Sequence, residues 1–204
     1  MRFSLGKENA GPPSIEPLKI MHTEKNIQEV LHRKLHSMLS DVPAHQPIVI
    51  ICVGTDRSTG DALGPLVGSR LLSQRLDGIH LYGTLDHPVH AMNLNDTLTT
   101  VYQHFNDPFI VAIDACLGQL TSVGCIQVGH GPVKPGAGVN KELPPVGHMH
   151  VTGIVNVGGF MEYFVLQNTR LSLVMNMAEV IATALYNTML HLRNPASTPF
   201  AKIE

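Results

Sequence analysis

Two short segments of the chain are apolar at every position rather than at alternate positions. They are Ile48–Val53 and Phe109–Ile113. A strand that is covered on both faces shows this pattern, whereas a strand with one face in water alternates apolar and polar residues. Both segments are therefore predicted to be inner strands of a parallel sheet that has helices on its two faces.

The rest of the chain alternates between helical and extended patterns. Apolar residues recur at helical spacing in several stretches, and short apolar runs between them predict further strands. In chain order, the expected elements are a helix at about 26–39, the first strand, a helix at about 62–76, a strand at about 79–82, a helix at about 91–105, the second strand, a strand at about 123–128, a helix at about 150–166, a strand near 171–174 and a helix at about 177–192. A strand is the alternative for residues 150–166, and a glycine-interrupted helix is the interpretation adopted. This alternation predicts right-handed βαβ crossovers and an α/β fold with a mostly parallel sheet.

Two segments lack a regular pattern. Residues 1–20 combine Gly11, Pro12 and Pro13 with polar residues, a composition that predicts a flexible tail before a single domain at residues 21–204. Residues 131–147 interleave prolines with glycines. So long an irregular stretch within a compact domain is typical of a functional loop.

Composition narrows the range of partners. The net charge of the 204 residues is −2, and no basic cluster contains interleaved aromatic residues, so we expect no nucleic-acid partner. The three cysteines, Cys52, Cys116 and Cys125, show no C-x-x-C spacing, which favours buried thiols in a reducing compartment. No stretch reaches the roughly 18 apolar residues of a membrane span. We therefore expect a cytoplasmic protein without membrane association, whose partner is a small molecule, a peptide or a protein.

Two aspartates follow the inner strands. Asp61 lies in the glycine-rich turn after the first strand, and Asp114 ends the second. Ligands of parallel sheets bind beyond the carboxyl ends of the strands, near the point where strand order reverses, so both side chains are expected there. Structural roles stay open for each, because Asp61 suits the first turn of a helix and Asp114 suits hydrogen bonds from loop amides. The turn matches no nucleotide-binding glycine motif, so a nucleotide is not expected.

The chemistry of such a pair depends on its separation. At about 4 Å and an effective dielectric of about 20, two carboxylates repel by roughly 4 kcal/mol, which raises one pKa by up to about three units. The protonated carboxyl can then polarise a carbonyl while the ionised one activates water, as in aspartic proteases. Alternatively, a divalent cation binds both carboxylates, with His150 as a third ligand and water in an open position. An ordinary polar loop histidine is the other interpretation of His150.

Three blocks of sequence resemble the spore germination protease, an aspartic endopeptidase that degrades small acid-soluble spore proteins. They are Gly60–Pro65, Ala112–Ala115 and Lys134–Asn140. From about residue 47 to residue 192 the chain is also similar to the YyaC-type sporulation proteins of spore-forming bacilli. Both groups share the fold of the hydrogenase maturation endopeptidases. The resemblance implies a phosphorylase/hydrolase-like three-layer α/β/α sandwich.

The resemblance also implies roles for individual residues. Asp61 and Asp114 match the two aspartates that the germination protease requires, and are the expected catalytic residues. Gly60, Gly136 and Gly138 lie in the matching blocks and are assigned to substrate binding.

We therefore expect a sporulation-associated peptidase in the cytoplasm of the forespore or sporulating cell. Peptides or small proteins, among them small acid-soluble spore proteins, are the expected substrates, and homo-oligomer formation stays open. The carboxylate mechanism requires no cofactor. Nickel or zinc is the candidate metal if Asp61, Asp114 and His150 form a site, because the maturation endopeptidases use matching positions to recognise a metal, commonly nickel, in their precursors. The alternative is a non-catalytic sporulation protein that binds a peptide or a metal in the equivalent cleft.

Overall fold

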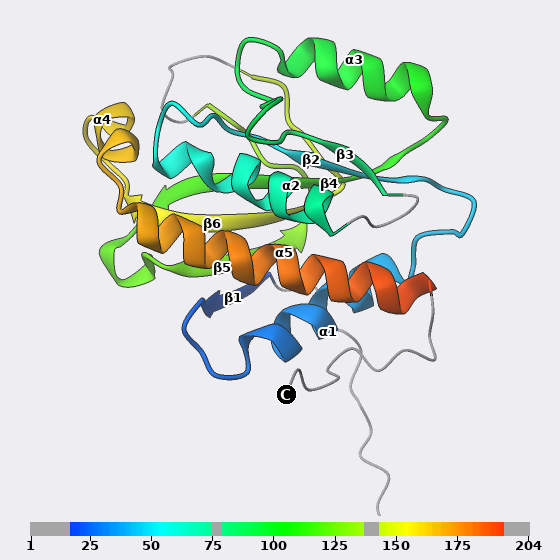
Figure 1. Cartoon of the computed structure of the whole chain (residues 1–204), viewed down its shortest axis with the longest axis horizontal. Helices are drawn as coiled ribbons and strands as arrows, with labels where there is room; N and C mark the ends of the chain where they lie inside the picture. The colour runs from blue at the N-terminus through cyan, green and yellow to red at the C-terminus, as the bar shows by residue number, and fades with distance from the viewer. Residues whose placement is uncertain (1–16, 75–78, 137–142, 194–204) are drawn as a thin grey trace, which may run out of the picture.

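One six-stranded sheet forms the centre of the molecule (Figure 1). The computed structural model describes residues 17–74, 79–136 and 143–193. The strands are β1 (Leu18–Met21), β2 (Ile48–Cys52), β3 (His80–Tyr82), β4 (Phe109–Gly118), β5 (Cys125–His130) and β6 (Met149–Val157), in the order β1-β5-β6-β4-β2-β3. Neighbours from β6 to β3 run parallel, while β5 is antiparallel to both β6 and β1. The mostly parallel sheet is thus confirmed.

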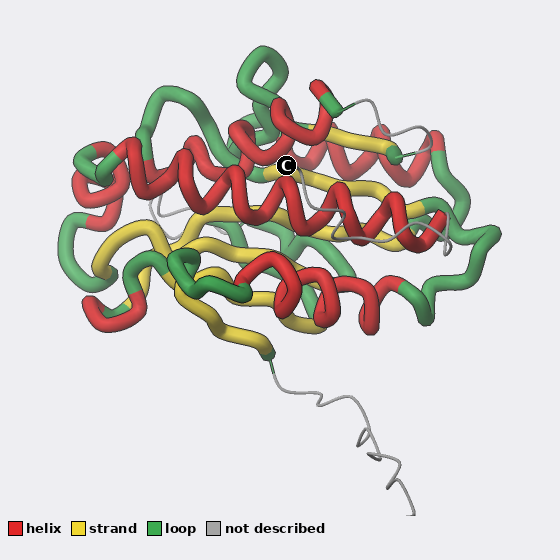
Figure 2. The backbone as a smooth tube through the Cα atoms, turned by 60° about the horizontal axis from the view of Figure 1, so that its bottom comes forward, coloured by secondary structure: helices red, strands yellow, loops and turns green. Residues whose placement is uncertain are grey.

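Helices cover both faces of this sheet. They are α1 (Ile27–Leu39), α2 (Leu63–Ser73), α3 (Leu94–His104), α4 (Glu162–Gln167) and α5 (Leu171–Arg193), with 3₁₀ turns η1 (Gly60–Ala62) and η2 (Leu120–Ser122). One hydrophobic core joins α1, α2 and α5 to one face of the sheet, and a second, smaller core joins α3 to the other. Figure 2 shows the helices packed along the strands. The three-layer α/β/α architecture is therefore confirmed.

The continuous apolar runs in β2 and β4 have the expected cause. Successive side chains of a strand point to opposite faces, so a strand between two helical layers needs apolar residues at every position. Val49, Ile51, Ile110 and Ala112 belong to the smaller core, whereas the intervening residues Ile50, Cys52, Val111 and Ile113 belong to the larger core.

The C-terminal part of the fold corrects two predictions. The helix expected at about 150–166 is wrong, because β6 occupies residues 149–157 and pairs with β4 on one side and β5 on the other. Within β6, a side chain at Gly153 would collide with Leu63 and Met177, so this glycine lets two helices approach the sheet. The strand expected near 171–174 is also wrong, because α5 already begins at Leu171.

The N-terminal boundary also differs from the sequence-based expectation. The predicted flexible tail extends to residue 20, but Leu18–Met21 form the edge strand β1, which pairs with β5. Residues 1–16, which make up most of that prediction, lie outside the described residues.

Helix α5 is the longest helix. By length and composition it is the single helix in the described part of the chain that would be long and apolar enough to cross a membrane. Half of its apolar window is buried inside the fold, and it packs on α1, α2 and β6. Its apolar character therefore follows from its position in the larger core.

Three histidines meet where α1 packs on α5. Their ring centroids are 5.8 Å apart for His32 and His36, 5.6 Å for His32 and His191, and 5.1 Å for His36 and His191. Nδ1 of the buried His32 lies 3.0 Å from Oγ1 of Thr188, which itself donates to the Ala184 carbonyl, so Nδ1 is the donor. Burial, followed by the neighbouring His36 and His191, lowers the pKa of His32.

We expect this cluster to destabilise the fold in acid. Because the pKa of His32 is lower in the folded protein than in the unfolded chain, the unfolded chain is protonated first. Stability is then lost as the pH falls from about 6.5 towards the folded value. Urea unfolding at pH 7.5 and pH 5.5 should show a smaller acid-induced loss in the double variant His36→Gln/His191→Gln than in the wild type. His104→Gln, on α3, is the control, and equal losses in all three proteins would contradict the expectation.

Candidate active site

A cavity of about 330 Å³ lies beyond the carboxyl ends of β2 and β4. From β2 the chain continues through α2 to β3 on one side, and then returns through α3 to β4 on the other side. Strand order therefore reverses between β2 and β4, which is the position where open α/β sheets bind ligands. The cavity wall comes from the β2–η1 turn, the end of β4, the loop before α3, the loop after β5 and helix α4.

Asp114 enters the cavity wall from β4, where it pairs with Thr152 of β6. Its Oδ1 accepts a hydrogen bond of 2.8 Å from the Ala115 amide. Burial raises the pKa of Asp114 to about 8, against the opposing effect of the Ala115 hydrogen bond, and the charge of Asp61 raises it further. This carboxyl is therefore mostly protonated at neutral pH.

Asp61 reaches the same cavity from η1. Burial raises its pKa, and the Ser58 hydroxyl lowers it. The buried Ser58 Oγ lies close enough to the carboxyl to favour its charged form without meeting the geometry of a full hydrogen bond. Burial therefore has the larger effect on the pKa of Asp61.

The two carboxyls thus line one cavity. The sequence predicts two causes of a raised pKa, the removal of Asp114 from water at the end of an apolar strand and the mutual repulsion of the two carboxylates. In the structure, burial is the largest cause at both Asp61 and Asp114, and the charge of Asp61 is a smaller contribution at Asp114. Their titrations are coupled, because the charge of Asp61 contributes to the raised pKa of Asp114.

The glycines expected to bind substrate lie in different places. Gly136 lines the cavity. Gly60 does not; it packs beneath α4, where an added Cβ would lie 2.8 Å from a methyl group of Leu166 and 3.1 Å from Thr169 Oγ1. Gly138 lies outside the described residues. Gly60 therefore has a packing role that brings η1 and α4 together.

His150 is not placed to join the carboxylates. Its ring lies over Gly129, and its Nδ1 is 3.0 Å from the Gly131 carbonyl. It pairs with Ala112, two residues before Asp114 along β4, and it does not line the cavity. In residues 17–74, 79–136 and 143–193, no group of three or more His, Cys, Asp or Glu side chains is arranged to hold a metal ion. The expected triad of metal ligands does not fit this geometry.

Several cavity residues were missed by sequence reasoning. Cys116 lies two positions after Asp114, so strand alternation alone could have placed it on the same face. Burial is the main cause that raises the pKa of Cys116 to about 11, which keeps the thiol protonated and a poor nucleophile. Ser58, Met92 and Tyr163 come from loops and from a helix that local patterns do not position.

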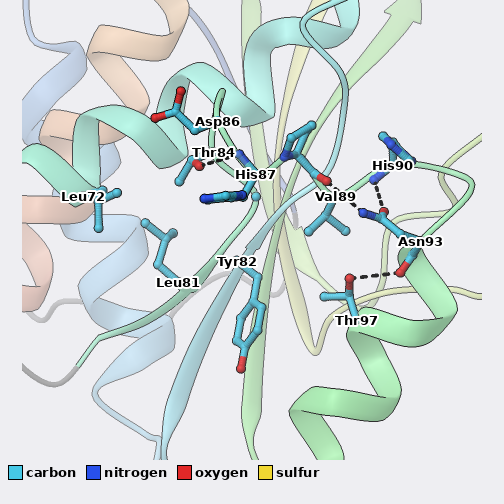
Figure 3. A pocket seen from close by; sticks show the side chains of 12 residues that line it. Leu72, Leu81, Tyr82, Thr84, Asp86, His87, Val89, His90, Asn93 and Thr97 are labelled. Atoms are coloured by element: carbon cyan, nitrogen blue, oxygen red, sulfur yellow. Dashed lines mark hydrogen bonds between the residues drawn. The ribbon is translucent and has the colours of Figure 1, made fainter.

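A second cavity of about 550 Å³ lies at the end of β3 (Figure 3). Much of its polar lining is already hydrogen-bonded within one loop: the Asn93 amide binds the His90 N–H at 2.8 Å and the Pro88 carbonyl at 3.0 Å. His90 lines both cavities, and its Nδ1 accepts a hydrogen bond of 3.2 Å from the Met92 amide. Neutral His90 therefore carries its proton on Nε2. This loop fixes His90 at the rim of the first cavity.

The fold and the cavity define an α/β protein with a partly buried carboxyl pair at the switch point of its sheet. The chain belongs to the family described as "Protein of unknown function (DUF1256)", whose model matches residues 19–184. It is 55% identical over 170 residues to "Uncharacterized protein YyaC" of Bacillus subtilis (strain 168), a match that covers 81% of this chain and 80% of that protein. The resemblance to YyaC-type proteins is thus confirmed.

A comparison of folds gives a weaker similarity. The [NiFe] hydrogenase maturation protease HycI from Thermococcus kodakarensis KOD1 superposes with a TM-score of 0.41 and 17% sequence identity. The match covers 73% of this chain and 99% of that protein. A similarity this low has no bearing on activity.

We expect Asp114→Asn to stabilise the protein at slightly alkaline pH. Because the folded pKa of Asp114 is raised to about 8, the stability present below the unfolded pKa of about 4 is lost as the pH rises towards 8. Asparagine keeps an oxygen for the Ala115 amide and cannot ionise. Its gain in the free energy of unfolding at pH 8 should be roughly 2 to 5 kcal/mol, measured by urea denaturation.

The exposed Asp41 provides a matched control, because Asp41→Asn should leave the unfolding curve nearly unchanged. A destabilised Asp114→Asn protein at pH 8 would show that the carboxylate is stabilised by the fold instead.

Proposed function

We propose that this protein is an aspartic-type peptidase in which Asp61 and Asp114 act on a water molecule held between them. The observation that carries the proposal is the presence, in one cavity, of two carboxyls whose pKa values burial raises, that of Asp114 to about 8. In the proposed mechanism Asp114 is the neutral carboxyl and Asp61 the ionised one, because general acid–base catalysis needs one group in each state at the same pH.

The reaction follows from these two states. Asp61 takes a proton from the water as the water oxygen attacks the carbonyl carbon of the peptide bond. Asp114 gives its proton to the carbonyl oxygen, which forms a neutral gem-diol intermediate. When this intermediate collapses, one hydroxyl returns its proton to Asp114, the proton on Asp61 passes to the leaving nitrogen, and the carbon–nitrogen bond breaks. Both side chains then regain their starting states.

Several features of the cavity suit this reaction. The Ser58 hydroxyl is buried beside Asp61 and favours the charged form of that carboxyl. Arg57, which also lines the cavity, is exposed and donates from Nε to Thr55 Oγ1 at 3.2 Å. Among the described residues, no cation contributes to the pKa shift of Asp61 or Asp114.

The choice of peptide bonds and the biological setting rest on the resemblance to the spore germination protease. We propose peptides or small proteins of the sporulating cell as substrates, with small acid-soluble spore proteins as the first candidates. The proposed location is the cytoplasm of the forespore or sporulating cell. A homo-oligomer is compatible with this function and is not required by the site.

A second function is a non-catalytic protein that binds a peptide in the same cavity. The lining of the cavity favours it, because apolar side chains such as Leu117 and Leu166 beside a polar one such as Ser58 suit ligand binding whether or not a bond is cleaved. This alternative predicts binding without turnover.

The test uses the full chain with quenched fluorescent peptides and with a spore-protein extract between pH 5 and pH 9. Asp61→Asn and Asp114→Asn should each lower kcat/KM at least 100-fold, the smallest effect typical of a lost acid or base. Asp56→Asn, an exposed aspartate in the same turn that does not line the cavity, should keep wild-type activity. Activity should fall as the pH rises past about 8, when Asp114 loses its proton.

The controls separate the alternatives. Full activity in either cavity variant would remove the carboxyl pair from the mechanism. Peptide binding with no cleavage by the wild type would favour the non-catalytic function. Loss of activity on chelation, restored by nickel or zinc, would contradict a mechanism carried by the two carboxyls alone.

A further inference from the structure

Helix α4 and the turn before it expose an unusual number of large apolar side chains. Phe160 is 90% exposed, Met161 64%, Tyr163 56% and Phe164 56%. These four residues, here termed the α4 apolar surface, lie within five positions of the chain. Single exposed apolar residues are common on soluble proteins, but a cluster of them indicates an interaction site.

The α4 apolar surface continues into the candidate active site. Tyr163 belongs both to the surface and to the cavity wall, and Leu166 of the same helix is a buried part of that wall. Across the cavity, Met92 lines the wall and is itself exposed. A peptide chain that leaves the cavity past Tyr163 therefore meets the α4 apolar surface.

The fold holds this surface in place. Asn156 of β6 donates from Nδ2 to the Val165 carbonyl at 3.3 Å and to Thr169 Oγ1 at 3.2 Å, which anchors the C-terminal half of α4. Leu166 packs against Gly60, next to Asp61. At the other end, Met161 has a left-handed backbone with φ of 56°, which costs free energy for a residue with a side chain. Such backbone strain is concentrated at functional sites.

We infer that the α4 apolar surface is an exosite that binds an apolar stretch of a polypeptide substrate outside the cavity. This inference rests on the proposed function and specifies its substrate class. A cavity of about 330 Å³ is at the small end of ligand sites, which span about 300 to 1,000 Å³, so most of a polypeptide must lie outside it. The chain segments that leave the cavity on the α4 side are then selected for apolar side chains.

The experiment compares two pools of fluorescein-labelled 20-residue peptides. Both pools are random over the central six positions; in one the flanks contain Leu and Phe, and in the other Ser and Gly. Affinity is measured by fluorescence anisotropy, and cleavage by mass spectrometry. We expect wild-type protein to bind the apolar-flank pool at least 10-fold more tightly. The double variant Phe160→Ser/Phe164→Ser should lose this preference while its affinity for a six-residue random pool stays unchanged.

Leu120→Ser is the matched control, since Leu120 is a similarly exposed apolar residue on η2 that does not line the cavity. It should keep the full preference. All three proteins should have the same circular dichroism spectrum, because the substituted side chains are exposed.

The outcomes separate the exosite from the proposed function. A preference without cleavage supports the exosite and removes the peptidase. Cleavage without a preference, or binding to neither pool, overturns the exosite. A double variant that changes from dimer to monomer in light scattering, with no change in peptide preference, also overturns it and identifies the surface as a contact between copies of the chain.

Discussion

The burial of the Asp114 carboxyl is the constraint on which the site depends. The apolar run before it, Ile110–Ile113, is enclosed by side chains from both helical layers, and β4 leads from that core straight into the cavity wall. Moving a carboxyl out of water favours its neutral form, so the packing that makes the sheet stable also sets the charge of this side chain. Removing this carboxyl from water costs free energy at neutral pH, and the packing of the two apolar cores offsets that cost.

The second carboxyl reaches the cavity because the glycine-rich turn allows close approaches of the backbone. At Gly54, φ is 144° and an added Cβ would overlap the Asp61 carbonyl oxygen, so the turn can fold tightly over the end of β2 only with glycine there. Gly60 makes the matching approach to α4. These glycines hold Asp61 in the wall of the cavity that Asp114 also lines, and they bring the turn against the helix that bears the α4 apolar surface.

The sequence was informative where one local pattern determines the structure. Apolar residues at every position of β2 and β4 identify buried parallel strands, and the two aspartates at their ends follow from the general position of ligands in such sheets. For residues 149–157 the predicted helix is wrong, because these residues form a strand by pairing with two strands that are distant in the sequence. Apolar runs of that length fit a helix or a strand equally well until tertiary contacts decide.

The residues of the cavity also divide into those that the sequence predicts and those that it does not. Asp61, Asp114 and Gly136 line it as expected, whereas His150, two residues before the position that pairs with Asp114, lies away from it. A difference of two positions along β6 decides whether a side chain lies beside Asp114. The spacing of residues in the sequence does not determine which position pairs with Asp114. Ser58 and Tyr163 reach the cavity through η1 and α4, whose placement depends on long-range packing against Gly60 and Asn156.

Burial keeps the Asp114 carboxyl neutral near physiological pH. The direct measurement is a ¹³C NMR titration of the aspartate carboxyl carbons between pH 3 and pH 9, with Asp114 assigned by comparison with the Asp114→Asn protein. We expect the Asp114 carboxyl to titrate near pH 8 and the Asp61 carboxyl to titrate above its ordinary pKa. Titration of every aspartate below about pH 5, close to the ordinary range of the side chain, would contradict this role of burial.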